Sequence, residues 1–322
     1  MKYKEWLNEW LNGYQKIYIK PRTYRNYDGV INNHILPMLG EYELDELSLK
    51  TLQSFIVDLE QNGHGRKAQG LAPGSVEIIM NVLQKSLDMA VDMGKIDYHY
   101  AGRLKRPKNE ISKAECFSMS EQKKIENAIM VQLPNKRIGI LISLYTGMRI
   151  GELMALRWED IDFHSHTITV NHTAREVYGN GKRETVLDSP KTVSSKRVIP
   201  IPYELMRLIR HEKSVSKCEY VISTSGGPTT SRSYQKIYKN LLKKLDIKYR
   251  NFHTLRHTFA TRAMECGMDV KTLSEIMGHK TPTITLNRYS HSLNEHKRAM
   301  MTLRSVRPAH CARPPILEGQ FF

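Results

Sequence analysis

The stretch HTLRHTFATRAMECGMDVKTLSEIMGHKTPTITLNRYSH, residues 253–291, decides how the C-terminal part of this chain folds. It reads as helix, turn, helix, turn, helix, because Gly267 and Gly278 end the first two helices and Pro282 opens the third. The cap of the first helix would come from a nearby side-chain oxygen, that of Asn251 or Thr254. We therefore expect three short helices that bring the two ends of the stretch together.

Four side chains of this stretch suit chemistry on a phosphodiester: His253, Arg256, His279 and Tyr289. His253 and Arg256 are one helical turn apart and leave from the same face. A phosphodiester under attack gathers negative charge, which guanidinium and imidazole N–H groups stabilise. A tyrosine hydroxyl can act as the covalent nucleophile when a neighbouring group orients it. The combination predicts phosphoryl transfer to tyrosine, if a second arginine and an acid for the leaving group lie elsewhere.

Two earlier blocks of sequence supply those groups. In TGMRIGELMALRWEDID, Gly147 makes a turn and a helix follows at once, which would hold Arg149 as a preorganised anion-binding group. Glu152 either orients Arg149 or forms an ordinary pair on the helix surface. Lys191 lies in DSPKTVSSKR, between two expected strands, where its ammonium is suited to protonate a departing alkoxide. A solvated lysine is the alternative interpretation of Lys191.

The whole sequence predicts a mainly α, multidomain fold. Residues 1–94 predict a domain of four helices, at about residues 6–17, 23–35, 49–61 and 76–93. Residues 95–117 lose apolar periodicity and indicate a basic linker. Residues 118–304 predict a mixed α+β catalytic domain with a small antiparallel sheet, whose strands fall within residues 168–173, 184–191 and 194–202. Residues 305–322 predict an irregular tail.

Composition favours a nucleic-acid partner and an intracellular location. The net charge of the 322 residues is +16, although residues 1–94 hold 10 Lys and Arg against 12 Asp and Glu. A merely basic soluble protein is the alternative. No apolar run approaches the length of a membrane span, and the N-terminus lacks a signal-peptide stretch, so we expect a cytoplasmic protein without a membrane partner. The four cysteines lack CxxC spacing and predict reduced thiols.

Basic residues outside the phosphodiester-binding set are candidates for contacts with the DNA backbone. In the N-terminal domain they are Lys20, Arg22, Arg25, Arg66 and Lys67. In the linker they are Arg103, Lys105, Arg106 and Lys108. A solvated basic edge and a plain tether are the alternative interpretations of these two groups.

Taken together, these blocks resemble the tyrosine recombinase (phage integrase) family. TGMRIGELMALRWEDID looks like that family's first-arginine block and SPKTVSSKRVIPIP like its hairpin lysine block. HTLRHTFAT looks like its His-x-x-Arg block, and MGHKTPTITLNRYSH like its Gly-His to Tyr block. The four blocks come in the family's order over residues 115–292, and the N-terminal helices with the basic linker resemble its core-binding domain. The resemblance thus covers about nine-tenths of the chain.

The resemblance implies a site-specific DNA recombinase that integrates, excises or resolves DNA. Tyr289 would attack the scissile phosphate, form a 3′-phosphotyrosyl link and free a 5′-hydroxyl. Arg149 and Arg256 would bind the non-bridging oxygens. His253 would assist proton transfer at the tyrosine. His279 would hydrogen-bond the phosphate, and Lys191 would protonate the leaving 5′-oxygen.

The resemblance also implies partners and cofactors. The enzyme would act as a homotetramer on double-stranded DNA with specific recombination sites, helped by accessory directionality or DNA-bending proteins, in a bacterial or phage-encoded, nucleoid-associated setting. No cofactor is implied, because the phosphotyrosyl link conserves the bond energy. The sequence agrees, since it has neither a Walker-type Gly-rich loop nor a carboxylate cluster for a metal.

Two features depart from many integrases of mobile elements. The helical domain starts within the first few residues, so we expect that a separate arm-type DNA-binding domain is absent or has been lost, which favours a simpler recombinase acting on short inverted repeats. Residues 307–322, RPAHCARPPILEGQFF, would be disordered, dock onto a neighbouring subunit, or be foreign to the protein.

Three rival interpretations remain. His253 and His257 have the i, i+4 spacing of helical zinc sites, but Thr254 replaces the expected Glu and Arg256 would place a cation beside the metal. A catalytically silent DNA-binding relative would keep the fold without the reaction. A DNA relaxase like the type IB topoisomerases would share the chemistry without joining two DNA sites.

Overall fold

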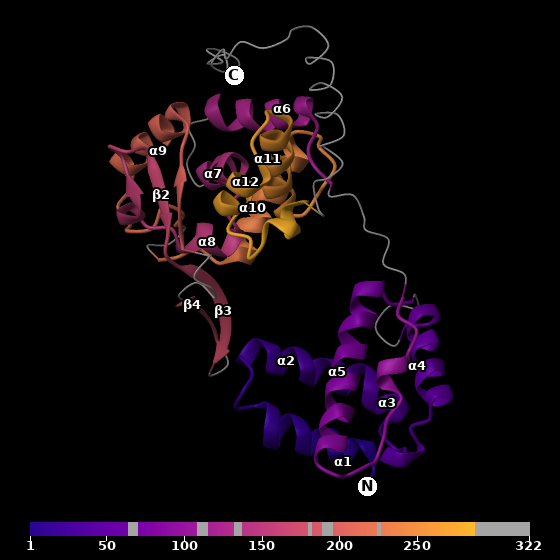
Figure 1. Cartoon of the computed structure of the whole chain (residues 1–322). Helices are drawn as coiled ribbons and strands as arrows, with labels where there is room; N and C mark the ends of the chain where they lie inside the picture. The colour runs from indigo at the N-terminus through magenta and orange to yellow at the C-terminus, as the bar shows by residue number, and fades with distance from the viewer. Residues whose placement is uncertain are drawn as a thin grey trace, which may run out of the picture. The chain divides into compact units, whose positions relative to one another are not determined.

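The computed structural model describes residues 1–63, 70–107, 115–131, 137–179, 182–188, 196–223 and 227–286, with backbone alone at 177–179 and 182–184. The chain divides into two compact units, Met1–Ser112 and Lys113–Phe322 (Figure 1). Within the described ranges, no helix is both long and apolar enough to cross a lipid bilayer.

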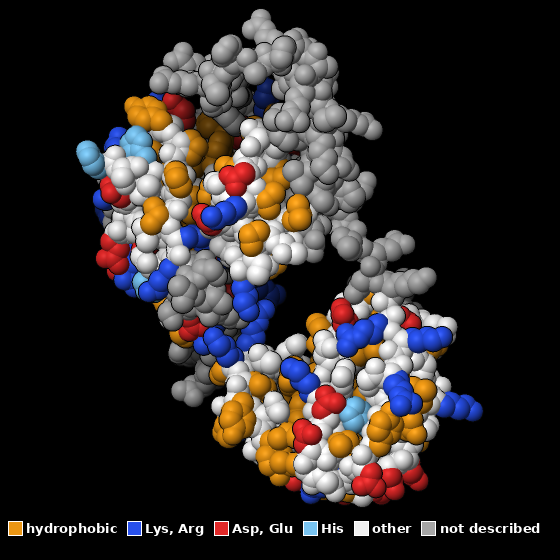
Figure 2. All heavy atoms as spheres, viewed as in Figure 1, with side chains coloured by type: hydrophobic (Ala, Val, Ile, Leu, Met, Phe, Trp, Pro, Cys, Tyr) orange, Lys and Arg blue, Asp and Glu red, His pale blue; other side chains and the backbone are white. Residues whose placement is uncertain are grey.

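The first unit is helical, as expected. Its elements are α1 (Tyr3–Asn8), the π-helix η1 (Glu9–Gln15), α2 (Pro21–Val30), the π-helix η2 (Ile31–Ile35), α3 (Leu36–Leu39), the 3₁₀ turn η3 (Leu44–Glu46), α4 (Leu49–Gln61), α5 (Pro73–Asp92) and the 3₁₀ turn η4 (Ala101–Arg103). Trp6 and Trp10 are fully buried in its core, among apolar side chains from every long helix. Figure 2 shows both acidic and basic side chains on the visible face of this unit.

Two π-helical segments make the helices of this unit differ from the expected ones. A π turn holds more residues than an α turn, so η1 rotates the apolar face, and Ile17, expected on that face, is 76% exposed. The second helix was expected to end before Pro37, but the chain stays helical through η2 and α3. Pro37 lies in the first turn of α3, where a backbone N–H has no partner within the helix, so the missing N–H of proline costs nothing there. Proline is tolerated in a first turn for the same reason at Pro73, where α5 begins, three residues before the expected start at residue 76.

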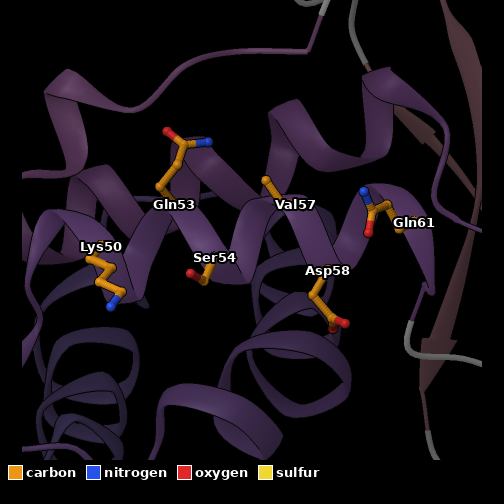
Figure 3. Close-up of a pocket in the computed structure, with 6 residues that line it drawn as sticks. All are labelled: Lys50, Gln53, Ser54, Val57, Asp58 and Gln61. Atoms are coloured by element: carbon orange, nitrogen blue, oxygen red, sulfur yellow. The ribbon is translucent and has the colours of Figure 1, made fainter.

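Part of the segment expected to be a linker packs against the first unit. Ile96, Ala101 and Leu104 belong to its apolar core. Just beyond them, the backbone N–H of Lys105 donates to the side chain of Gln53 at 2.9 Å. Gln53 lies in a shallow groove along α4 (Figure 3), whose other lining residues are Lys50, Ser54, Val57, Asp58 and Gln61.

The second unit combines helices with antiparallel strands, as expected, but the strands form two small sheets rather than one. Its helices are α6 (Met119–Val131), α7 (Ile138–Thr146), α8 (Ile150–Ala155), the 3₁₀ turn η6 (Trp158–Asp160), α9 (Tyr203–Val215), α10 (Ser231–Lys244), α11 (His253–Glu265) and α12 (Val270–Met277). Its strands are β1 (Ile161–Asp162), β2 (Thr167–Val170), β3 (Thr173–Gly179), β4 (Lys182–Asp188) and β5 (Arg197–Pro200). Residues 282–286 are also helical.

The strands pair in two separate sheets. One sheet has the order β1-β2-β5, and β3 and β4 form a hairpin of their own (Figure 1). The expected strand at residues 168–173 is therefore split between the two sheets. The chain bends between β2 and β3, where the side chain of Asn171 donates to Asp160 at 2.9 Å.

Helix α7 forms the centre of the second unit. All its residues except Tyr145 are buried, so it is apolar on every side, which is the pattern of a core helix. It packs against α11, which carries the His-x-x-Arg block. Gly147 ends α7 with φ +65°, and the chain turns there directly into the segment of Arg149.

Candidate active site

Arg149 is held at the start of α8 by three hydrogen bonds. Its Nη1 donates to Glu152 Oε1 at 2.8 Å, and its backbone N–H donates to the other oxygen of that carboxylate at 2.9 Å. Its Nη2 donates to the carbonyl of Gly278 at 2.9 Å. The side chain of Glu152 is only 6% exposed. Of the two interpretations of Glu152, orientation of Arg149 is therefore the one the structure supports.

Arg256 connects two other turns of the same region. It is 2% exposed on α11, and its Nη1 donates to the carbonyl of Gly147 at 2.6 Å. Its Nη2 donates to the carbonyl of Met277 at 2.7 Å. The two guanidinium groups thus bind adjacent carbonyls at the end of α12, those of Met277 and Gly278. Arginines fixed by several backbone acceptors lose little freedom when they bind an anion.

His279 follows directly after the left-handed Gly278, which has φ +62° and ends α12 as expected. The backbone N–H of His279 donates to Ser274, and its ring Nδ1 lies 2.7 Å from the hydroxyl of Thr285. Thr285 is fully buried, so this contact fixes the orientation of the ring. A partner of this kind was not predicted, because nothing in the sequence distinguishes Thr285 from its neighbours.

His253 is the first residue of α11, one turn before Arg256. Its ring packs edge to face on that of His257, with centroids 4.7 Å apart. The expected cap from Asn251 or Thr254 is wrong, because Phe252 occupies the cap position and makes no side-chain cap bond. Phe252 instead packs its ring against two buried tyrosines, Tyr234 and Tyr238. Among the described residues, no group of three or more His, Cys, Asp or Glu side chains could hold a metal ion.

The sequence did not single out Arg197, which lies at the start of β5. Its side chain is 6% exposed and pairs with Glu152 at 2.8 Å. Burial by itself raises the pKa of Glu152, but the hydrogen bonds and positive charge of Arg197, with the charge of Arg149, outweigh burial and bring that pKa down to about 2. Glu152 is thus an ionised carboxylate shared by two arginines.

The structure brings Arg149, Arg256 and His279 together around the end of α12. Two members of the expected set, Lys191 and Tyr289, lie outside the described residues, as do the candidate DNA contacts Arg66, Lys67 and Lys108. The other candidate DNA contacts are exposed in the first unit: Lys20, Arg22, Arg25, Arg103, Lys105 and Arg106. Arg106 lies 3.4 Å from Glu77, and Arg103 lies over the ring of Tyr98.

Comparison with known proteins identifies the group to which the chain belongs. Residues 109–296 match the phage integrase family, and residues 2–59 match the SAM-like N-terminal domain of phage integrases. A tyrosine recombinase XerC-like protein of Caldanaerobacter subterraneus subsp. tengcongensis is 29% identical over 93% of this chain and 82% of its own length.

Solved structures share the fold. A Tn1549 transposon integrase bound to transposon right end DNA is 22% identical and superposes with a TM-score of 0.76, over 95% of this chain and all of the other. A lambda integrase tetramer bound to a Holliday junction is 18% identical with a TM-score of 0.67, over 89% of this chain and 77% of the other. Since the family match spans more than half of the sequence and the fold agrees with it, the chain belongs to the phage integrase family of tyrosine recombinases.

Proposed function

We propose that this protein is a site-specific DNA recombinase that cuts and rejoins DNA through a 3′-phosphotyrosyl intermediate. The observation that carries the proposal is the pair of guanidinium groups of Arg149 and Arg256, fixed by adjacent carbonyls next to His279. Arg149 is 37% exposed at its side chain, so a phosphate can reach it from solvent. Two preorganised arginines beside an imidazole are suited to stabilise the negative charge that builds up on the non-bridging oxygens of a phosphodiester under attack.

The proposed reaction has two transfers that conserve the phosphodiester bond. The hydroxyl of Tyr289 attacks the scissile phosphate, the O–P bond to the 5′-oxygen breaks, and a 3′-phosphotyrosyl link forms. His253 assists removal of the tyrosine proton, and Lys191 gives a proton to the leaving 5′-oxygen. A 5′-hydroxyl from a second DNA strand then attacks the link and releases Tyr289.

The proposal includes how the protein is organised on DNA. Residues 118–304 form the catalytic domain and residues 1–94 the core-binding domain, joined by the basic segment 95–117. Four copies act on two duplexes, and neither a metal nor ATP takes part. We place the protein in the integration and excision of a mobile element. Relatives named as integrases and the DNA-bound neighbours support this role.

A covalent trapping experiment identifies the target site and tests the reaction together. The protein and the DNA of the organism or element that encodes it are mixed and denatured with detergent, and protein-linked DNA ends are isolated and sequenced. We expect one recurring sequence with wild type and none with Tyr289→Phe. A catalytically silent binding protein would give no linked ends with either.

Supercoiled plasmids with zero, one or two copies of the recovered sequence separate a recombinase from a relaxase. We expect inversion or excision only on plasmids with two copies. Relaxation that proceeds equally without any copy would contradict the recombinase and favour an enzyme of the type IB topoisomerase kind.

A further inference from the structure

The end of α12 is bound by three arginines, and one of them has no place in the proposed reaction. The carbonyls of three consecutive residues, Ile276, Met277 and Gly278, each accept a hydrogen bond from a different arginine, namely Arg197 at 2.6 Å, Arg256 at 2.7 Å and Arg149 at 2.9 Å. Carbonyls at a helix C-terminus carry partial negative charge, so cations are favoured there. His279 follows this turn directly.

Arg197 differs from the other two arginines in its other partner. Its Nη1 and Nη2 donate to the two oxygens of Glu152, at 3.1 and 2.8 Å. Glu152 Oε1 also accepts from Arg149 at 2.8 Å. With a side chain only 6% exposed, Arg197 is covered by protein, whereas Arg149 is 37% exposed. The two arginines thus share one carboxylate, and only Arg149 has substantial access to solvent.

The charges of these three groups do not cancel. Two guanidinium ions and one carboxylate leave a single positive charge. If Arg149 were paired with Glu152 alone, the carboxylate would orient it but would also neutralise it, and at low dielectric such a neighbour strongly weakens attraction for a phosphate. A second arginine on the far side of Glu152 removes this conflict.

We infer that Arg197 is a positioning residue, whose charge compensates Glu152 so that Arg149 is oriented by a carboxylate and still presents its positive charge to the scissile phosphate. Its contact with Ile276 also holds the turn that carries His279. Gly278 fits this arrangement, since a Cβ there would lie 3.0 Å from Arg197 Nη1. The inference rests on the proposed function, because it concerns the rate of the same cleavage step.

A double-mutant cycle between Arg197 and Glu152 tests this inference. Arg197→Gln, Glu152→Gln and the double variant are compared with wild type. The measured quantities are the rate of covalent adduct formation at saturating protein, the Kd for the same DNA and the Tm. We expect Arg197→Gln to cut the rate by about tenfold to a hundredfold, as is usual for residues that orient a directly acting group. The Kd should change by less than about threefold, since other phosphate contacts dominate binding.

The double variant separates charge compensation from a purely structural role. Adding Glu152→Gln to Arg197→Gln restores the single positive charge, so we expect the rate to recover by about fivefold or more, since a carboxylate next to Arg149 is removed. If Arg197 were only structural, the second change would leave the rate where it was or lower it further. That result, or an Arg197→Gln variant as fast as wild type, would overturn the inference.

Two further variants complete the design. Arg262→Gln is the matched control, because Arg262 also pairs with a carboxylate, Glu265, and donates to a backbone carbonyl, that of Phe117, away from the α12 turn. We expect its adduct rate to match wild type. Should Arg197→Gln fail to fold, Arg197→Lys replaces it. Lysine keeps the charge but cannot make the forked pair of bonds to Glu152, so a loss of less than about tenfold supports the inference and a larger loss contradicts it.

The result with the wild-type protein separates failure of the proposed function from failure of the proposed role of Arg197. A wild type that forms no adduct on its own site would reject the proposed function and this inference with it. A wild type that forms the adduct, beside an equally active Arg197→Gln, would reject the role of Arg197 alone.

Discussion

At the scale of single residues, the site depends on a carboxylate that stays ionised although it is buried. Glu152 is 6% exposed, and burial alone would raise its pKa. The two arginines that share it reverse the effect, and its pKa falls from 4.5 to about 2. A depressed pKa contributes stability that is present above the pKa of the unfolded chain and lost as the pH falls toward that of the folded protein.

The pH dependence of stability is the corresponding prediction. Between pH 5 and pH 3 the wild type should lose about 2 kcal/mol of unfolding free energy as Glu152 becomes protonated in the unfolded chain. The Glu152→Gln variant should not show this loss, because it has no carboxylate at this position. Urea denaturation of both proteins across this range measures the difference. Parallel curves for the two proteins would show that Glu152 is not held by the arginines as described.

At the scale of elements, the site depends on the turns that end α7 and α12. Gly147 has φ +65°, and its carbonyl accepts from Arg256, so the end of α7 sets the position of that guanidinium. A Cβ at Gly147 would lie 2.7 Å from the ring of Phe259. Gly94, at the end of α5, has the same φ of +65°, but a Cβ there would meet nothing within 4 Å.

These two glycines form a matched pair for mutation. Gly94→Ala should cost about 1 kcal/mol, the usual penalty for a side chain in the left-handed region. Gly147→Ala should cost about 1–3 kcal/mol more because the methyl group overpacks the ring, and it should also slow adduct formation by displacing the acceptor of Arg256. Calorimetry and the adduct assay measure both effects. Equal losses of stability would contradict the described packing of Phe259.

The same elements show what the sequence could predict. The sequence singled out Arg149, Arg256 and His279 as members of one site, and the structure places them around the end of α12. Their roles in the reaction stay a prediction. Arg197 could not be singled out, because its partners Glu152 and Ile276 are 45 and 79 residues away and meet it only in the folded unit. The π-helices η1 and η2 were missed because an apolar pattern read at the α-helical period carries no signal for an extra residue in a turn.

At the scale of the whole molecule, charge should govern DNA binding. The net charge is +16, although residues 1–94 alone have a net charge of −2, from 10 basic and 12 acidic residues. Any phosphate contact made by residues 1–94 must therefore come from particular side chains. Arg22 and Arg25 are exposed near the start of α2, where they are one helical turn apart.

Salt dependence tests these contacts. The slope of log K against log salt is negative, and if Arg22 and Arg25 each neutralise a phosphate, replacing both by Gln should reduce its magnitude by about 2. Lys2→Gln with Lys4→Gln is the matched control, because both lysines of this exposed pair contact Glu41 of the same unit, at 2.8 and 2.6 Å. Fluorescence anisotropy on the recovered DNA site gives both slopes. An unchanged slope for the arginine pair would remove these residues from the interface.

The central claim is that Tyr289 becomes covalently joined to the 3′-phosphate of the strand end that the cut creates. The most direct measurement uses a duplex of the recovered site with a nick a few nucleotides 3′ of the scissile phosphate, so that cleavage releases a short fragment with a 5′-hydroxyl, which diffuses away. The duplex carries separate labels on the two sides of the cut. Wild type and Tyr289→Phe are incubated with it in EDTA without ATP and run on a denaturing protein gel. We expect a slow-migrating adduct with wild type only, carrying the label of the strand that ends in the 3′-phosphate. An adduct with Tyr289→Phe, an adduct carrying the other label, or binding of the DNA by both proteins without any adduct would contradict the account.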